Sequence, residues 1–198
     1  GTEKGVLTFC LDEEGNIQES LELSGHWEDE GYLKMFQSSE EDIFIAGQSG
    51  EKARVAKVSS LGAEMWSKEY NMSGKDSLTD TRMDSFGNLY LLLNGEIGEK
   101  KRASILKLDG EGEVLWNQTC LDSFPYDVHG LTICLNNEDN LMVFGKLSKG
   151  EEWDIAYLLQ YSQTGTPVLE SYPKESREGE KSFVRYYPNP FYDRLTIE

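Results

Sequence analysis

Short stretches of alternating apolar and polar residues run along most of the chain, as expected for β-strands with one buried face. Four of them align with one another without gaps, at residues 6–15, 53–62, 103–112 and 156–165. Each leads into a polar turn closed by glycine, and the closing glycines lie 47, 50 and 53 residues apart. Glycine adopts the positive φ of a tight turn at little cost, and a second strand-like segment follows each one. The repeated unit therefore contains a β-hairpin.

Two more strands precede the hairpin in the later copies, again separated by a polar turn. These pairs of segments lie near 33–38 and 42–47, 78–84 and 88–93, and 131–135 and 140–145. One copy is thus four antiparallel strands, with β-branched and aromatic residues in the strands and Gly, Asn and Asp in the turns. No window of about eleven or more residues has a helical period, so the sequence predicts an all-β fold.

Four short strands per repeat at this period are typical of a β-propeller blade, and a β-sandwich with coincidental spacing is the alternative. The predicted organisation is a half blade at 5–24 followed by blades at about 25–72, 73–122 and 123–173. About three and a half blades do not close a ring of roughly six to eight. Three explanations remain open: the chain is the C-terminal part of a longer protein, which we favour; a homodimer completes the ring; or the C-terminal strands close a small four-bladed ring.

The repeat also resembles a known family at the level of its residues. The pattern Ala-x-x-apolar-Lys-apolar-Asp-x-x-Gly-x-apolar-apolar-Trp ends the best copy, Asn88 to Trp116, and a good copy spans Asp42 to Trp66. This pattern resembles the propeller repeats of bacterial secreted and surface proteins. The resemblance covers about residues 5–173 and implies an architecture, because propellers host many unrelated functions.

The C-terminal region has a different composition. Residues 174–182 are polar and charged and are predicted to form a linker, and 183–198 form either a closing hairpin with a Pro-rich turn or the start of another domain. The motif Pro188, Asn189, Pro190 and Phe191, flanked by aromatic residues and followed by an apolar-x-apolar strand, resembles the opening of the C-terminal sorting domain of type IX secretion substrates. That resemblance implies a parent protein recognised by the type IX secretion machinery and either released or held at the outer surface of a Gram-negative bacterium. The later strands of that domain are not in the sequence.

The charge balance excludes several classes of partner. Nineteen basic residues against 36 acidic ones give a formal net charge of −17 over 198 residues. A phosphate backbone would be repelled, so we expect no nucleic-acid binding. The longest apolar run, Leu89 to Leu93, is five residues, and a membrane helix needs about 20, so no membrane insertion is expected.

Catalytic signals are weak. The histidines, His26 and His129, are predicted to lie in loops that connect strands, and neither has a triad pattern around it. No transition-metal spacing occurs. The turns at 109–113 and 12–16 place oxygen groups at alternate positions, which suits Ca²⁺, although ordinary turn chemistry explains Asp and Gly there equally well. The sequence favours a protein that is not an enzyme and that needs no cofactor. Ca²⁺ is the one ion for which the sequence offers a candidate site.

The topology of a blade offers a better site. Loops from the fourth strand to the next blade, and from the second strand to the third, emerge on one face. Four aromatic residues fall on those loops: Trp27, Phe124, Tyr126 and Trp153. Such rings stack on sugars or anchor a protein, although they also pack between blades. The predicted function is a non-catalytic module that binds glycan or protein. The alternatives are an enzyme fragment (hydrolase or lyase) completed by blades outside the chain, or a structural spacer.

Overall fold

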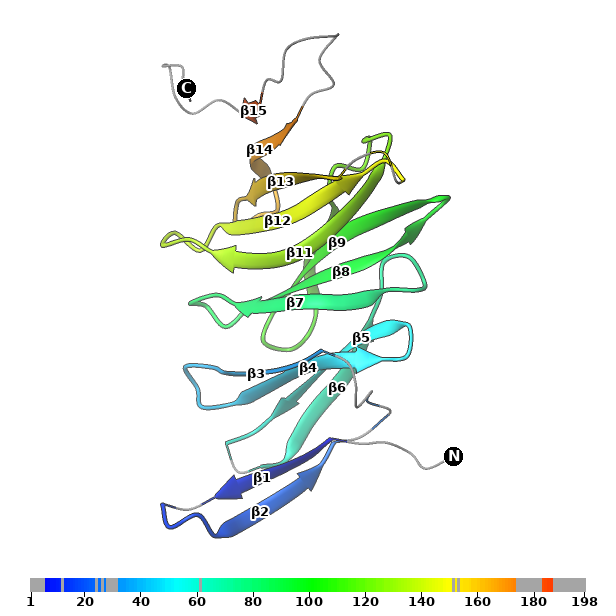
Figure 1. Ribbon diagram of the computed structural model, residues 1–198. Helices are drawn as coiled ribbons and strands as arrows, with labels where there is room; N and C mark the ends of the chain where they lie inside the picture. Colours follow the sequence, from blue (N-terminus) through cyan, green and yellow to red (C-terminus); the bar gives the residue numbers. More distant parts are fainter. Residues whose placement is uncertain are drawn as a thin grey trace.

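A computed structural model describes residues 6–11, 13–23, 25, 27, 32–60, 62–150, 152, 154–173 and 183–186. Within these residues the regular structure is entirely β: fifteen strands form four antiparallel sheets, and there is no helix. The sheets are stacked in chain order, with the first and fourth at opposite ends of the stack (Figure 1). The all-β prediction is confirmed.

Each strand pairs with its neighbour in the sequence. The first sheet has β1 (Leu7–Leu11) and β2 (Ile17–Glu22). The second has β3 (Leu33–Gln37), β4 (Ile43–Ser49), β5 (Lys52–Val58) and β6 (Glu64–Tyr70). The third has β7 (Ser77–Met83), β8 (Leu89–Ile97), β9 (Lys100–Leu108) and β10 (Val114–Thr119). The fourth has β11 (Asp127–Leu135), β12 (Leu141–Ser148), β13 (Asp154–Tyr161), β14 (Pro167–Pro173) and β15 (Phe183–Tyr186).

The repeat is visible in the backbone. The glycines that close the aligned turns, Gly15, Gly62, Gly112 and Gly165, have φ between 73° and 84°. Just after each of them, the pairing register shifts by one residue, so β2, β6, β10 and β14 all begin with a β-bulge. A bulge increases local twist and redirects the side chains that follow it. The four copies therefore share their local geometry as well as their sequence.

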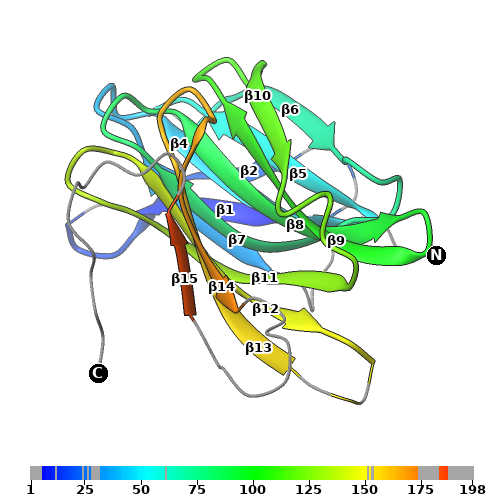
Figure 2. The ribbon, with the colours of Figure 1, turned by 90° about the horizontal axis from the view of Figure 1, so that it is seen from above.

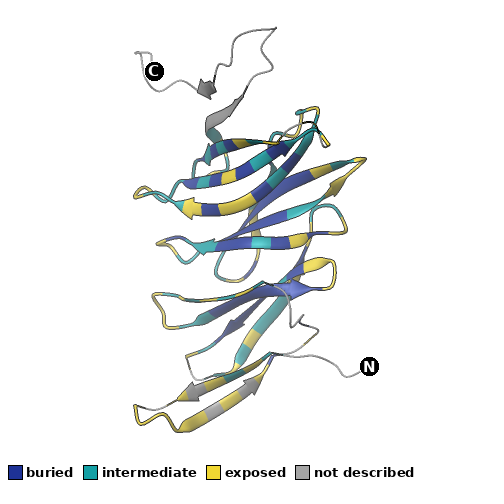
Figure 3. Ribbon diagram, in the orientation of Figure 1, coloured by how far each residue is buried: buried dark blue, intermediate teal, exposed yellow. Residues whose placement is uncertain are grey.

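The core lies between the sheets. Leu92 and Ile105 of the third sheet pack with Ile133, Val143 and Leu159 of the fourth. Similar clusters join the second sheet to the third and the first to the second. Each fully buried aliphatic side chain contributes roughly 1.5–3 kcal/mol, so stacking of the sheets is the main source of stability. Burial is densest in the middle sheets and sparse in β1 and β2 (Figure 3).

The last described strand extends the fourth sheet. β15 pairs with β14, with Leu169 opposite Tyr186 and Glu170 opposite Arg185 (Figure 2). It therefore does not supply the inner strands that β1 and β2 lack among the described residues. The linker at 174–182 and the motif Pro188, Asn189, Pro190 and Phe191 lie outside the described part of the chain. Their assignment stays a prediction.

No helix in the described ranges combines the length and the apolar character that crossing a bilayer requires. Of the cysteines that the structure describes fully, Cys120 is buried, Cys134 is exposed, and neither forms a disulfide.

Candidate functional site

The loop that joins β10 to β11, residues 120–126, is held from beneath by one buried cation. Arg102 of β9 is only 5% exposed, and its guanidinium donates hydrogen bonds to the carbonyls of Phe124 (2.8 Å) and Tyr126 (2.7 Å). Within the loop, the Phe124 N–H donates to the Leu121 carbonyl at 2.8 Å. Hydrogen bonds from an ionised donor are stronger than neutral ones. The loop is therefore fixed in one shape before any ligand arrives.

Two of the four predicted aromatic residues come together on this loop. The rings of Phe124 and Tyr126 meet edge to face, with centroids 5.7 Å apart and planes at 74°. The ammonium of Lys149, from the β12–β13 turn, lies 5.5 Å from the centroid of Tyr126. The 120–126 loop and the β12–β13 turn are thus neighbours at the same end of the strands.

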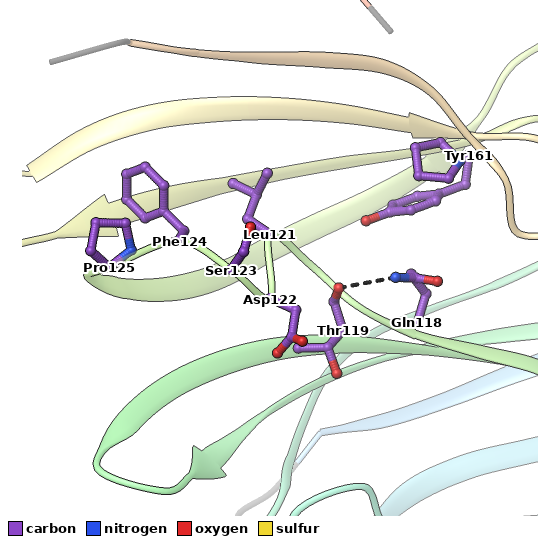
Figure 4. A pocket seen from close by; sticks show the side chains of 9 residues that line it. Gln118, Thr119, Leu121, Asp122, Ser123, Phe124, Pro125 and Tyr161 are labelled. Carbon is purple, nitrogen blue, oxygen red and sulfur yellow. Dashed lines mark hydrogen bonds between the residues drawn. The ribbon is translucent and has the colours of Figure 1, made fainter. Parts of the chain in front are cut away.

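A cavity of about 300 Å³ lies beside the loop, between β10 and the β13–β14 hairpin. Figure 4 shows Phe124, Pro125 and Leu121 around one part of it and Tyr161 across from them, with polar side chains between. Its complete lining is Gln118, Thr119, Leu121, Asp122, Ser123, Phe124, Pro125, Tyr161 and Pro167. The volume is at the small end of ligand pockets, so it suits one or two sugar rings or a single side chain.

The cavity mixes apolar walls with hydrogen-bonding groups. Asp122 and Ser123 are exposed at the mouth, and the Gln118 amide reaches the Thr119 carbonyl at 3.4 Å, which is a weak contact that a ligand can replace. Leu121 has a φ of +48°, a conformation that costs a non-glycine residue energy. Strained residues persist where the surrounding structure enforces them, and here the Leu121 carbonyl accepts a hydrogen bond from the Phe124 N–H.

Trp27 has a different place from the one expected. Its side chain is 2% exposed and packs with Ile45 and Val58 between the first and second sheets, and the Arg54 guanidinium lies 5.8 Å from its ring centroid. The indole fills the space between the two sheets, so it does not present a stacking face to solvent. We leave it out of the candidate site. Trp153 lies outside the described residues.

The expectation that His129 lies in a loop is wrong. It lies within β11, opposite Lys146 of β12. Burial lowers the pKa of His129, and the nearby Lys101 and Lys146 lower it further, which favours the neutral imidazole. The strand continues through this position because Val128 and Gly130 on either side are buried against the third sheet.

The turn considered for Ca²⁺ has a defined structural role. Asp109 Oδ1 accepts hydrogen bonds from the backbone N–H groups of Glu111 (2.9 Å) and Glu113 (2.8 Å), as in an ordinary Asx turn. In the described part of the chain, no three or more His, Cys, Asp or Glu side chains gather as metal ligands would. Ca²⁺ binding stays a prediction.

In the described part of the chain, the carboxylate with the most hydrogen-bond partners is Asp80 of β7, which the sequence did not single out. Its Oδ1 accepts from Arg82 (2.6 Å), from Lys34 (3.2 Å) and from the Tyr32 hydroxyl (3.2 Å). Its Oδ2 accepts from the Thr132 hydroxyl (2.6 Å) and the Ile133 N–H (3.0 Å).

Asp80 therefore links the first strands of three sheets: β3 through Lys34, its own strand β7, and β11 through Thr132 and Ile133. Burial alone would raise its pKa, but the hydrogen bonds from the fourth sheet and the nearby Arg82 lower it to about 2. We interpret this cluster as structural.

No family model matches the chain, and no curated protein matches it by sequence.

Proposed function

We propose that the chain is a non-catalytic glycan-binding module built from β-propeller blades, with its binding site at the cavity beside the 120–126 loop. The assignment of the four-stranded sheets as blades is supported by their meander order, by their stacking face to face, and by the bulge repeated at the start of each outer strand. Blades of this kind present their loops at the two ends of the strands, where binding residues concentrate.

One observation carries the proposal: Arg102 holds the loop so that Phe124, with Tyr126 packed against it, lines a cavity that also contains polar groups. A sugar ring offers apolar C–H faces to stack on an aromatic ring and hydroxyls to pair with neighbouring polar groups. Asp122 and Gln118 supply those partners. The net charge of −17 disfavours acidic sugars, so the expected ligand is a neutral or amino sugar.

Binding is favoured over hydrolysis by the chemistry of the lining. Hydrolysis of a glycosidic bond by the usual route takes two carboxyl groups on opposite sides of the bond. Among the described residues that line this cavity, Asp122 is the one carboxylate.

The proposed location of the protein rests on its sequence alone. We propose that the parent protein is exported by the type IX secretion machinery and resides outside the cell, on the resemblance of the motif Pro188 to Phe191 to the start of a sorting domain. A neutral-glycan ligand suits that location.

A glycan microarray of neutral and amino oligosaccharides, followed by calorimetric titration of the best binder, tests the binding function. Phe124→Ala and Tyr126→Ala should each weaken binding about tenfold, as expected for the loss of about 1.4 kcal/mol. Phe86→Ala is the matched control, because Phe86 is 77% exposed in the β7–β8 turn at the other end of the strands. If the unaltered protein and the three variants bind a glycan with equal affinity, the proposed site is wrong. If no glycan binds the unaltered protein, the proposed function is wrong.

A further inference from the structure

The outward face of β1 carries apolar side chains that nothing in the described structure covers. Leu7, Phe9 and Leu11 are 53%, 52% and 57% exposed. They alternate along the strand and so share the face that points away from the second sheet. Three exposed large apolar residues side by side on one face of a strand form a contiguous apolar patch, and such patches mark interaction surfaces.

In the later copies of the repeat, the residues equivalent to this face are buried. The residues aligned with Phe9 are Ala56, Leu106 and Leu159, and those aligned with Leu11 are Val58, Leu108 and Tyr161. All six are at most 3% exposed. In each case the sheet before them in the chain covers them: Ala56 packs with Leu23, Leu106 with Val55, and Leu159 with Ile105.

β3 repeats the pattern one sheet further along. Met35 pairs with Ile45, as Thr81 pairs with Leu91 and Ile133 with Val143, so these three inner-strand residues are equivalent. Met35 is 59% exposed, whereas Thr81 and Ile133 are buried. In the second sheet, β4 and β5 cover β7. In the third sheet, β7, β8 and β9 cover β11. The first sheet has no inner strands among the described residues, and Met35 is exposed for that reason.

A covering sheet brings three kinds of side chain with it. The first is an amide that pairs with the backbone of the next sheet: Asn94 donates to the Gly130 carbonyl and accepts from the Gly130 N–H, each at 2.8 Å, and Gln48 bonds Asp76 and Leu78 in the same way. This amide fixes the position of the next inner strand.

The second and third are a buried lysine and a tryptophan. Lys107 Nζ contacts the Gln163 side chain, and Lys57 Nζ lies 3.3 Å from Glu111, both on the closing turn of the next sheet. Trp116 donates to the Gln163 carbonyl at 2.9 Å. Together the amide, the lysine and the tryptophan attach one sheet to the next.

The fourth sheet does not carry this set. Lys146, Gln160 and Leu169 occupy the positions of the amide, the lysine and the tryptophan. Lys146 is already paired with Asp154 at 2.9 Å. A second copy of this chain therefore offers a poor covering face, and a net charge of −17 on each copy opposes its approach.

We propose that the face of Leu7, Phe9 and Leu11, together with the open edge of β1, docks another sheet of the same repeat, one that carries the amide, lysine and tryptophan and adds an inner hairpin over Met35. The proposal continues the interfaces already present between the second and third sheets and between the third and fourth. It does not depend on the glycan site.

An extended chain tests it. A copy of residues 73–153 is placed directly before residue 4, because Lys4 aligns with Asp154 in the repeat. The added copy of β12 should then pair with β1, as the original β12 pairs with β13. The added copy of Trp116 should lie beside Gly15, as the original Trp116 lies beside Gly165. Hydrogen exchange read by mass spectrometry on the peptides of β1 and β3 should slow by about tenfold or more relative to the original chain, since global or sub-global opening is then required.

Two matched variants sharpen the result. Trp116→Ala in the added copy alone should reverse most of the slowing in β1. Phe9→Thr with Leu11→Thr should also reverse it, yet should leave the urea midpoint of the original chain unchanged, because both side chains are more than half exposed there. Unchanged exchange in β1 and β3, while the added strands are themselves protected, would overturn the proposal. So would a dimer of the original chain in light scattering that Phe9→Thr abolishes, because the occupant would then be a second copy.

Discussion

The ammonium of Lys107 lies 3.1 Å from Asp84 Oδ2, and the two side chains are almost completely buried. The same pair recurs in the sheet before, where Lys57 lies 3.2 Å from Asp42. Each lysine also lies over an aromatic ring of its own sheet, 4.9 Å from Tyr90 in one case and 5.5 Å from Phe44 in the other. A buried cation at the same place in two repeats is part of the contact between sheets.

Removal of one partner from this pair should be costly. Lys107→Met leaves the Asp84 carboxylate buried without its cation, and we expect a loss of about 3–5 kcal/mol in the free energy of unfolding, measured by urea denaturation. Lys75→Met is the control, because Lys75 and its partner Glu51 are both well exposed and their pair contributes little. A Lys107→Met protein as stable as the control variant would show that the pair contributes nothing.

The pKa of Asp80, lowered to about 2, predicts an acid-dependent loss of stability. Because the pKa in the folded state lies below the unfolded value of 3.8, the charged carboxylate stabilises the fold above about pH 4. This contribution, about 2 kcal/mol, should disappear as the pH falls from about 4 to 2. Urea midpoints at pH 6, 4 and 3 measure it. Asp80→Asn should lower the free energy of unfolding at pH 6 and should reduce its fall below pH 4. If the fall below pH 4 is the same in the variant as in the unaltered protein, ionised Asp80 does not stabilise the fold.

The closing glycine of the fourth sheet should not tolerate a side chain. Gly165 has a φ of +79°, and a Cβ there would lie 2.8 Å from the Trp116 ring. Gly165→Ala should therefore cost the backbone penalty of roughly 1–2 kcal/mol and a further loss from displacing the indole. Gly98→Ala isolates the backbone term, because Gly98 has a φ of +67° and open space around it. Similar unfolding free energies for the two variants would mean that the Trp116 contact is unimportant.

The role of Arg102 can be tested without a ligand. Arg102→Met keeps most of the aliphatic stem but removes the hydrogen bonds to the carbonyls of Phe124 and Tyr126. We expect faster hydrogen exchange in residues 121–126 and little change in β8. If a glycan binds as proposed, its affinity should fall although Arg102 does not line the cavity. Exchange in the loop equal to that of the unaltered protein would show that the loop is held by other contacts.

Much of the fold could be predicted from the sequence because its signals are local. Period-two alternation locates the strands, and glycines such as Gly62 and Gly112 locate the turns. Contacts between sheets leave no comparable pattern. Trp27 reads as a loop aromatic, yet it is buried because the space beneath β1 and β2 accommodates a large ring. Asp80 reads as one acid among 36, and its partners come from positions about fifty residues away on each side.

The site shows the same division. Phe124 and Tyr126 could be selected from the sequence as aromatic residues on one loop, and the structure places them together. Arg102 could not, because its role depends on the pairing of β9 with β10, which brings the guanidinium under the loop.

The hydrogen bonds of Asp80 bear on how the stack of sheets comes apart. In most repeat arrays each unit contacts only its neighbours, so stability is a sum of nearest-neighbour terms and the array frays from its ends. Here one carboxylate holds the second, third and fourth sheets at once, through Lys34, its own strand and Thr132. The three full sheets should therefore melt as one cooperative unit, with only β1 and β2 free to fray separately.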